Sequence, residues 1–499
     1  MSQHDVVVVG GGIGGLTTAA LLAARGLDVC LFERESRAGG CAAAFEHMGY
    51  AFEQGAGLYA CWQPGEIHER VFAELPLGAP EVRRAAPAYV VRLPDGAEVR
   101  VGGEREEFDE TLRAAFPECA AASLEFYREA RAIGDALRRS AARVPALVTA
   151  TRIERVKLIA QEARLSARIL GSMGHTAAEH LRDTSARFRR FIDAQLCVFA
   201  QRPSDECAYL YAAVALSHAA RGMYELRGGA QALADALVES IKMSGGTVRL
   251  SATVLRLARD ASGRAAGVDL LSGERVEARR AVVSNLTVWD TYGKLVGLAD
   301  TSTDVRARMK RLRGWGAYLI FIALDERAAA RLPATHVLAL TDFQEGARLD
   351  PEESLLMLGA APGWDARAPE GFRAATVCTH TDAEQWFAFH DDEAAHEEQD
   401  AAALEKCWAR LHRALPELGA GAEVIETATP RTCYERTRRR LGMVGGTGQS
   451  LDVFGAGALT HRTSVPRLYM VGDTVFPGQG VAAVTHSALI AANEIAPPR

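Results

Sequence analysis

The sequence lacks the features that mark metalloproteins, disulfide-rich secreted proteins and integral membrane proteins. Its nine cysteines are scattered and form no Cys-x-x-Cys pair, so neither a zinc site nor a disulfide framework is predicted. No apolar run reaches the roughly 18 residues of a membrane span, and the first predicted strand has begun by Asp5. We therefore expect no signal peptide and no transmembrane helix, and a reducing cytoplasm is the default location.

An overall excess of basic charge is also missing. The net charge is -6, which argues against general nucleic-acid binding, so no nucleic-acid partner is expected. Residues 128–190 are an exception, because Lys and Arg there outnumber Asp and Glu by more than two to one.

This basic segment lies within a region, from about Glu104 to Ala200, whose apolar positions recur at helical spacing, as at Ile153, Val156 and Ile159. We interpret the region as an inserted helical subdomain. Helices with arginine on one face and apolar residues on another can lie at an anionic bilayer surface, so residues 128–190 are a candidate for peripheral membrane contact. The alternative is a solvated, charged face of a cap subdomain, and both interpretations stay open.

The chain is rich in glycine, and several of its glycines lie at positions that predict local structure. Its 499 residues include 46 glycines against 18 prolines, and the length predicts roughly two to three domains. Near the N-terminus a β-branched strand, a glycine turn, an Ala/Leu helix ending near Gly26 and a second strand form one βαβ unit.

The turn of this unit carries Gly10, Gly12 and Gly15 in the spacing Gly-x-Gly-x-x-Gly, with Ile13 and Gly14 inside it. The first glycine permits a tight turn, the second a close approach of the backbone to a diphosphate, and the third close packing of helix on strand. The helix N-terminus then offers free N–H groups to the phosphates. This pattern predicts a bound dinucleotide.

An acid and a second glycine doublet follow. Glu33 ends the second predicted strand, where a carboxylate can accept hydrogen bonds from a ribose diol. Beyond it come Arg34 and the Arg37-x-Gly39-Gly40 stretch, and then Gly49, Tyr50, Phe52, Glu53 and Gly55. In these residues the chain resembles the phytoene desaturase and carotenoid isomerase family of FAD-dependent oxidoreductases, within the amine oxidase superfamily. It departs from the family pattern at Cys41, Ala44 and Glu53, and Cys41 is interpreted as a small packed thiol.

The segment LYMVGDTVFPGQGVAAVTHSALIAAN is similar to the closing motif of the same family. The resemblance implies that Gly472 and Asp473 end a strand at the cofactor and that Gly480 and Val481 open the last helix beside the isoalloxazine ring. A helix N-terminus there would favour the negative charge of the reduced ring.

The middle of the chain repeats the glycine pattern at Arg227-Gly228-Gly229, ahead of a predicted helix and a strand starting at Thr247. The resemblance implies that Val254 offers backbone groups to the adenine and that Asn285 closes this module. The predicted cofactor is FAD. Its predicted binding residues are Gly10, Gly12, Ile13, Gly14, Gly15, Glu33, Arg34, Arg37, Gly39, Gly40, Val254, Asn285, Gly472, Asp473, Gly480 and Val481.

The implied fold is α/β. It is a discontinuous Rossmann-like FAD-binding domain of the glutathione reductase-like superfamily, with an inserted mixed α+β substrate domain and a helical subdomain. We predict a first FAD-binding part at 1–103, a helical subdomain at 104–224, a second FAD-binding part at 225–298, a substrate domain at 299–431 and a closing FAD-binding part at 432–499.

The resemblance implies an apolar polyene or isoprenoid-like substrate that exchanges hydride with flavin N5. The activity would be that of a desaturase or saturase, as in the related animal retinol saturases, or of a cis-trans isomerase that uses reduced FAD. A flavin-free lipid-binding protein on the same scaffold and an amine or protoporphyrinogen oxidase are the alternatives. No catalytic residue is assigned: His218, His390 and His486 are candidates by residue type alone, and structural roles are favoured for each. No metal site is predicted, and the oligomeric state is left open.

Overall fold

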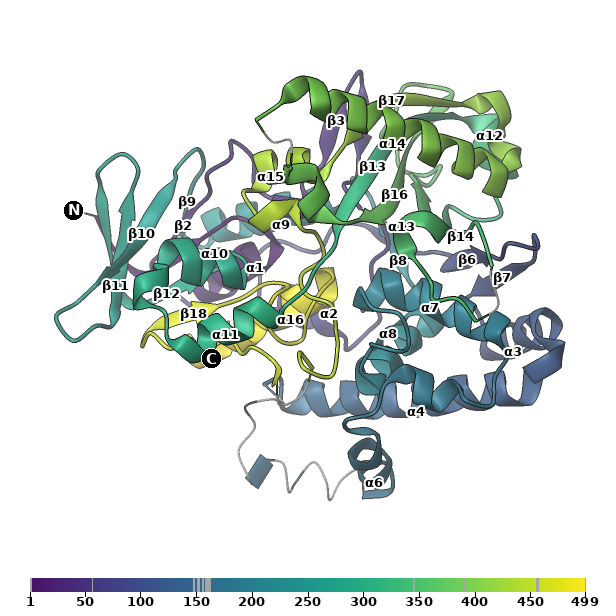
Figure 1. The fold of residues 1–499 in the computed structure, drawn as a ribbon. Coiled ribbons are helices and arrows are strands. Elements are labelled where there is room, and N and C mark those ends of the chain that lie inside the picture. The colour runs from purple at the N-terminus through teal and green to yellow at the C-terminus, as the bar shows by residue number, and fades with distance from the viewer. Residues whose placement is uncertain are drawn as a thin grey trace.

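The computed structural model describes residues 2–498 except 56, 147, 148, 150–152, 155, 156, 158–162, 344, 345, 389, 390, 455 and 456. Two seven-stranded sheets organise these residues (Figure 1). The first sheet, on the left of the view, contains both the first and the last strand of the described chain, and the second sheet lies on the right beside a group of helices.

The first sheet has the order β10-β11-β12-β1-β2-β9, and β18 also pairs with β12. Its strands are β1 (Ser2–Val9), β2 (Val29–Phe32), β9 (Thr247–Arg249), β10 (Val254–Arg259), β11 (Ala265–Leu270), β12 (Arg275–Ser284) and β18 (Leu468–Met470). Pairing is parallel along β18, β12, β1, β2 and β9, whereas β10 and β11 form an antiparallel extension. The run Val6 to Val9 is fully buried, as expected of a central parallel strand covered on both faces.

Helices cover both faces of this sheet. The helices on one face share a core with β1 and β2; they are α1 (Ile13–Ala24), α2 (Ile67–Phe72), α9 (Gly229–Met243) and α16 (Val481–Ile495). Those on the other face are α10 (Val288–Asp290), the π-helical turn Thr291–Leu295 and α11 (Thr303–Arg311). The last helix, α16, therefore packs beside the first, α1.

The second sheet has the order β17-β13-β16-β15-β14-β6-β7. Its strands are β6 (Tyr89–Arg92), β7 (Glu98–Val101), β13 (Gly316–Asp325), β14 (His336–Leu340), β15 (Leu355–Ala360), β16 (Phe372–Thr381) and β17 (Ala422–Ala428). One face packs against α12 (Glu326–Arg331) and α14 (Glu393–Ala414), where Trp386, Cys407 and Leu411 are buried.

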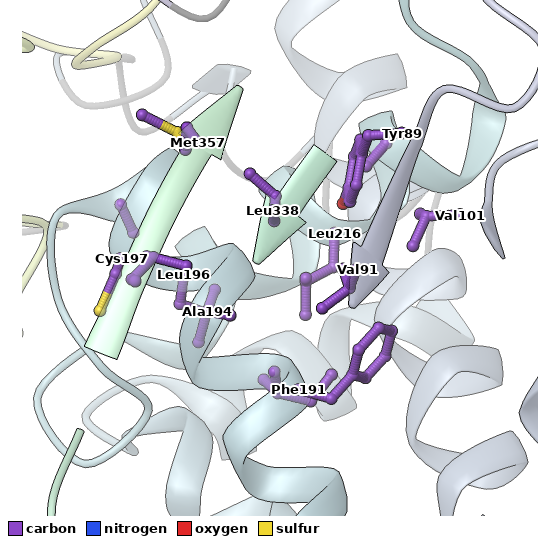
Figure 2. Close-up of a cluster of buried hydrophobic side chains, with 14 of the residues drawn as sticks. Tyr89, Val91, Val101, Phe191, Ala194, Leu196, Cys197, Leu216, Leu338 and Met357 are labelled. Carbon is purple, nitrogen blue, oxygen red and sulfur yellow. The ribbon is translucent and has the colours of Figure 1, made fainter. Parts of the chain in front are cut away.

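The opposite face packs against a helical subdomain. Its helices are α3 (Arg105–Ala115), α4 (Ala120–Arg143), α6 (Ala163–Ser172), α7 (Ala186–Ala200) and α8 (Tyr209–Arg221). Figure 2 shows Phe191 and Leu196 of α7 close to Tyr89 of β6, Leu338 of β14 and Met357 of β15. This shared core joins the helices to the sheet.

Shorter elements connect these layers. They are β3 (Phe45–His47) paired with β4 (Tyr50–Phe52), β5 (Val82–Arg84) paired with β8 (Tyr224–Leu226), α13 (Pro351–Ser354), α15 (Pro430–Thr437) and 3-10 turns at Gly40–Ala42, Pro117–Cys119, Ala177–Leu181, Leu298–Asp300, Ala383–Phe387, Pro416–Gly421 and Arg440–Gly442.

The predicted local elements agree with the structure. The N-terminal βαβ unit, the helix and strand after Gly228 and the closing strand and helix are all present. One long-range pairing was not anticipated: β6 and β7 lie in the predicted first FAD-binding part but pair with the second sheet. The five-part division of the chain stays a prediction. Of the periodic positions in the insert, Ile153 is exposed, whereas Val156 and Ile159 lie outside the described residues.

Candidate functional site

A cavity of about 910 Å³ runs between the two sheets. One side of its lining is formed by the glycine turn after β1, the Gly39–Gly40 doublet, the start of β10 and the loop between β18 and α16. The other side is one patch of the second sheet. Segments more than 400 residues apart in the sequence therefore meet at one site.

The glycine turn brings the backbone into the cavity wall at the N-terminus of α1. Gly12 caps this helix, and Gly39 donates its N–H to Gly11 O at 2.8 Å, which holds the second glycine stretch against the first. A Cβ at Gly40 would lie 3.2 Å from Gly12 Cα. The free N–H groups of the first turn of α1 thus face the space between two glycine segments, a suitable site for an anion.

Asn285 lies between the glycine turn and the closing motif. A Cβ at Gly12 would lie 2.7 Å from Asn285 Nδ2, and a Cβ at Gly14 would lie 2.7 Å from Asn285 Oδ1 and 3.2 Å from Gly472 N. The backbone N–H of Asn285 donates to Val9 O at 2.8 Å. Glycine is required at positions 12 and 14 because the amide of Asn285 fills the space that a side chain would need.

Glu33 lies at the other end of the glycine turn, directly after β2. Its Oε2 accepts a hydrogen bond from Gly11 N at 2.6 Å and its Oε1 one from Glu35 N at 2.9 Å. Val254, the first residue of β10, lies in the same part of the wall, as do Ala252 and Thr253. These residues form a pocket with a carboxylate on one side and a strand backbone on the other.

The two predicted arginines at this end have protein partners. Arg34 donates to Glu435 O at 3.0 Å and Arg436 O at 3.2 Å, and Arg37 Nη1 lies 2.7 Å from Glu46 Oε1. Both line the cavity and add positive charge beside the glycine doublet.

Asp473 forms an ion pair with Arg439 deep in the cavity wall, with Arg439 Nη2 2.9 Å from Asp473 Oδ2. Burial opposes the charged form of Arg439, but the Asp473 carboxylate more than compensates and raises the pKa of the guanidinium. Arg439 also donates to Met443 O at 2.8 Å. Burial raises the pKa of the nearby Cys41 thiol, against the opposing effect of Arg439. Cys41 is therefore held as a neutral thiol.

The part of the cavity against the second sheet and α7 is mainly apolar. Its wall consists of Phe45, Leu58, Val198, Phe199, Ala317, Met357 and Cys378. Ala317 on β13 and Met357 on β15 flank β16, which supplies Cys378. Such a surface suits an apolar ligand.

Nearly all the predicted cofactor-binding residues line this one cavity. They are Gly10, Gly12, Ile13, Gly14, Glu33, Arg34, Arg37, Gly39, Gly40, Val254, Asn285, Gly472, Asp473, Gly480 and Val481. Gly15 does not line it. A side chain at Gly15 would collide with Gly10 O, so this residue allows α1 to pack on β1.

The histidines that were candidates by residue type lie elsewhere. His218 is in α8 against Cys61 Sγ, and His486 is in α16, where its Nε2 lies 3.0 Å from Pro145 O; neither lines the cavity. His390 lies outside the described residues. His380 on β16, which the sequence pattern did not single out, lies in the cavity wall instead.

Buried neutral histidines make the stability of this protein depend on pH. Burial lowers the pKa to about 3 in His68 and His336 and to about 4 in His218, His380 and His486. In the unfolded chain each binds a proton near pH 6.5, so the unfolded state gains protons first as the pH falls. The free energy of unfolding should fall between about pH 6 and pH 4, by up to about 1.4 kcal/mol per pH unit for each histidine.

Urea unfolding of the holoprotein at several pH values measures this slope. His68→Phe keeps a ring against Trp62, 4.1 Å away, and removes the titrating group, so it should make the slope shallower. An unchanged slope would show that His68 does not contribute to the pH dependence of the free energy of unfolding.

Several residues of the wall had no signal in the sequence strong enough to single them out. They are Gln201, Arg439 and the already noted His380. Arg439 is one of three consecutive arginines, and only the fold shows which of them turns toward Asp473. Within the described residues, no cluster of His, Cys, Asp and Glu could hold a metal ion, and no described helix is long and apolar enough to cross a bilayer.

The fold and the cavity define a dinucleotide-binding protein with a second, apolar compartment beside the nucleotide site. The model of the family described as flavin containing amine oxidoreductase matches residues 13–496. The chain belongs to this family. The predictions of an FAD-dependent oxidoreductase and of FAD as the cofactor are thereby confirmed, and the flavin-free alternative loses its basis.

Comparison with individual proteins shows which members of the family this chain resembles. The chain is 25% identical to the chloroplastic prolycopene isomerase of Daucus carota, over 99% of this chain and 80% of the relative. It is 26% identical to the Arabidopsis thaliana isomerase, over 99% and 83%, and 23% identical to the human all-trans-retinol 13,14-reductase, over 98% and 85%. The predicted resemblance to carotenoid isomerases and retinol saturases is confirmed.

Solved structures share the fold at low sequence identity. An oxidoreductase from Methanosarcina mazei superposes with a TM-score of 0.63 at 17% identity, covering 98% of this chain and 99% of the other. A putrescine oxidase bound to putrescine also gives 0.63 at 17% identity, covering 99% and 98%. Both share the mixed α/β fold of this chain.

Proposed function

We propose that this oxidoreductase acts on an apolar polyene or isoprenoid-like molecule by hydride transfer between a substrate carbon and flavin N5. The observation that supports this proposal is the continuity of the cavity. The glycine-lined half, which suits a dinucleotide, opens directly into a half lined by Phe199, Met357 and Cys378. Desaturation would remove a hydride from one carbon and a proton from its neighbour, and saturation would reverse both transfers.

In this proposal, the predicted residues each hold one part of FAD. Glu33 accepts hydrogen bonds from the adenosine ribose, and Val254 meets the adenine. The first turn of α1, with Gly12, Ile13 and Gly14, binds the diphosphate together with Gly39 and Gly40. Asn285 and Gly472 keep the closing motif against this turn, and Asp473, oriented by Arg439, binds the ribityl chain. The space that glycines and the Asn285 amide leave at the α1 N-terminus fits a diphosphate.

The redox chemistry is supplied by the bound flavin, and the protein provides position and electrostatics. The N-terminus of α16, at Gly480 and Val481, presents N–H groups and the positive end of the helix dipole, which would favour negative charge on a flavin ring held beside it. The apolar wall excludes water and aligns the reacting carbon.

Anaerobic titration of the yellow holoprotein with lycopene and with all-trans-retinol tests this proposal. The oxidised protein should lose its visible flavin absorbance with a polyene that donates hydride, or the reduced protein should regain it with one that accepts hydride. Putrescine, a small diamine, serves as the control and should leave the spectrum unchanged. Bleaching by putrescine, with neither polyene acting on the oxidised or reduced protein, would contradict the proposal.

Cis-trans isomerisation with reduced FAD is a second candidate. The match to prolycopene isomerases over 99% of this chain favours it. In the same experiment, an isomerase would change the geometry of a cis-polyene only with the reduced protein, without net change in flavin absorbance. Product analysis by chromatography separates the two activities.

Peripheral membrane contact through residues 128–190 stays part of this proposal. Exposed apolar side chains in and near this segment support it, namely Ile153, Leu170 and Met173. A lipid-soluble substrate could be collected at such a surface.

A further inference from the structure

Two buried polar side chains interrupt the apolar wall of the cavity. Gln201 is 3% exposed and follows α7, and His380 is 7% exposed and lies near the end of β16. Both line the cavity beside Val198, Phe199 and Ala317. A wall that only had to contact hydrocarbon would contain neither group, because burying an unpaired polar atom costs roughly 1–3 kcal/mol.

The amide of Gln201 is held in one orientation. Its Nε2 donates to Val444 O at 2.5 Å, so a flipped amide would place two oxygens against each other. The remaining Oε1 is buried and has no hydrogen-bond partner among the described residues. The backbone of Gln201 has φ +54°, in the left-handed region, which costs a residue with a side chain on the order of 1 kcal/mol. Because Gln201 is the C-cap of α7, this conformation ends the helix, and the unused Oε1 is the feature that indicates a ligand.

His380 offers the complementary group. Its ring lies 5.9 Å from the Trp315 ring, and its side chain is part of the cavity wall. Burial lowers the pKa of His380 to about 4, so at neutral pH the imidazole has one N–H donor and one acceptor nitrogen.

A series of contacts through Val444 and Trp315 links the two residues. Gln201 binds the carbonyl of Val444, whose N–H donates to Trp315 O at 3.0 Å, and Trp315 contacts the ring of His380. A side chain at Gly445 would collide with the Gln201 amide, so the glycine leaves room for it.

Of the five carboxylates that line the described cavity, four are paired with a cation of the protein, Glu35 with Arg34 among them, and the fifth, Glu33, accepts two backbone N–H groups. Asp473 is paired with Arg439 and Glu46 with Arg37, and Asp290 Oδ1 lies 2.8 Å from Lys294 Nζ. A protonated amine would therefore meet two neutral groups in a buried wall, which is unfavourable. A hydroxyl suits either group, since it can donate to Gln201 Oε1 or accept from the His380 N–H.

We propose that Gln201 and His380 form a recognition subsite for a hydroxyl group on the isoprenoid substrate. The enzyme then prefers an alcohol over the hydrocarbon of the same carbon skeleton. This inference rests on the proposed function, which it deepens by assigning a polar group to one end of the substrate. Neither residue is assigned a role in hydride transfer; both act on specificity.

The test compares two pairs of probes that differ only in oxygen: all-trans-retinol with its deoxy hydrocarbon, and lycopene with its 1-hydroxy-1,2-dihydro derivative. Dissociation constants are measured anaerobically on the holoprotein from the change in flavin absorbance. The wild type should bind the alcohol of at least one pair about tenfold more tightly than the hydrocarbon, a difference of about 1.4 kcal/mol.

Gln201→Met and His380→Phe should each reduce this preference, and the double variant should abolish it while the affinity for the hydrocarbon stays the same or rises. Met357→Leu changes an apolar part of the same wall and should leave the ratio of affinities unchanged. Flavin content and spectrum are recorded for every variant.

Three outcomes would overturn the inference. Equal affinity of the wild type for alcohol and hydrocarbon would do so and would leave the proposed function intact. A shifted flavin spectrum or loss of flavin in Gln201→Met, with an unchanged preference, would assign Gln201 to the cofactor instead. Binding of neither pair would contradict the proposed function itself.

Discussion

Replacement of Gly14 by valine should yield a protein that no longer retains FAD. A Cβ at this position would lie 2.7 Å from Asn285 Oδ1 and 3.2 Å from Gly472 N, and the second of these is a backbone atom that cannot turn away. The valine side chain would push the closing motif from the start of α1. Overpacking of this kind costs roughly 1–3 kcal/mol, which corresponds to about 5- to 150-fold weaker binding if it falls on the cofactor site.

The flavin-to-protein ratio after gel filtration measures retention, and titration of the apoprotein with FAD measures the dissociation constant. Gly78→Val is the matched control, because nothing lies within 4 Å of a Cβ at Gly78 and its backbone is not left-handed. This control should stay yellow. Unfolding by urea shows whether both variants are folded. A folded Gly14→Val protein with wild-type affinity for FAD would show that the contact between Gly14 and Gly472 has no part in cofactor binding.

Glu53→Ala should lower the free energy of unfolding by about 2–5 kcal/mol, because two donors lose their acceptor at a cost of roughly 1–3 kcal/mol each, and this is a large share of the stability of a typical protein. Glu53 Oε1 accepts hydrogen bonds from the Tyr59 hydroxyl and, at 2.9 Å, from Ala230 N at the start of α9. Its Oε2 lies 3.7 Å from Arg367 Nη1. The alanine would leave a buried hydroxyl and a helix N-terminal N–H without their acceptor.

Urea unfolding of the FAD-saturated protein at neutral pH checks this value. Tyr59→Phe removes only one of the hydrogen bonds and should cost about 0.5–1.5 kcal/mol. The double variant gives the coupling free energy between the two residues. Once Glu53 is absent, Tyr59→Phe removes no further hydrogen bond to it, so the second substitution should cost less than in the wild type. A loss below about 1 kcal/mol for Glu53→Ala would mean that water replaces the carboxylate.

The sequence predicted those parts of the fold whose signal is local. The strand, glycine turn and helix at residues 2–24 follow from a β-branched run, a glycine spacing and an Ala/Leu helix, and Thr247 begins β9 as expected. The pairing of β6 with β14 was not predictable in the same way. These strands are more than 240 residues apart, and the alternation of side chains along β6 does not specify its partner.

The same limit applies to the site. The glycines, Glu33 and Asp473 were found because their roles depend on short motifs. His380 and Gln201 are not in a motif. They are distinguished by burial in the cavity wall and, for Gln201, by an acceptor without a partner among the described residues, and only the tertiary structure defines these features. Conversely, His218 and His486 have the residue type of a catalytic base but lie outside the cavity.

The first sheet contains both β1 and β18, and this arrangement affects folding during synthesis. The partner strands of β1 include β12, and the wall facing Gly14 is completed by Gly472 in the loop before α16. At translation rates of roughly 5–20 residues per second, roughly 20 seconds or more separate synthesis of the first glycine turn from that of the last. During that interval the apolar strand β1 has no complete sheet to join. We therefore expect the nascent chain to depend on chaperones and to acquire its flavin only after residue 481 has left the ribosome.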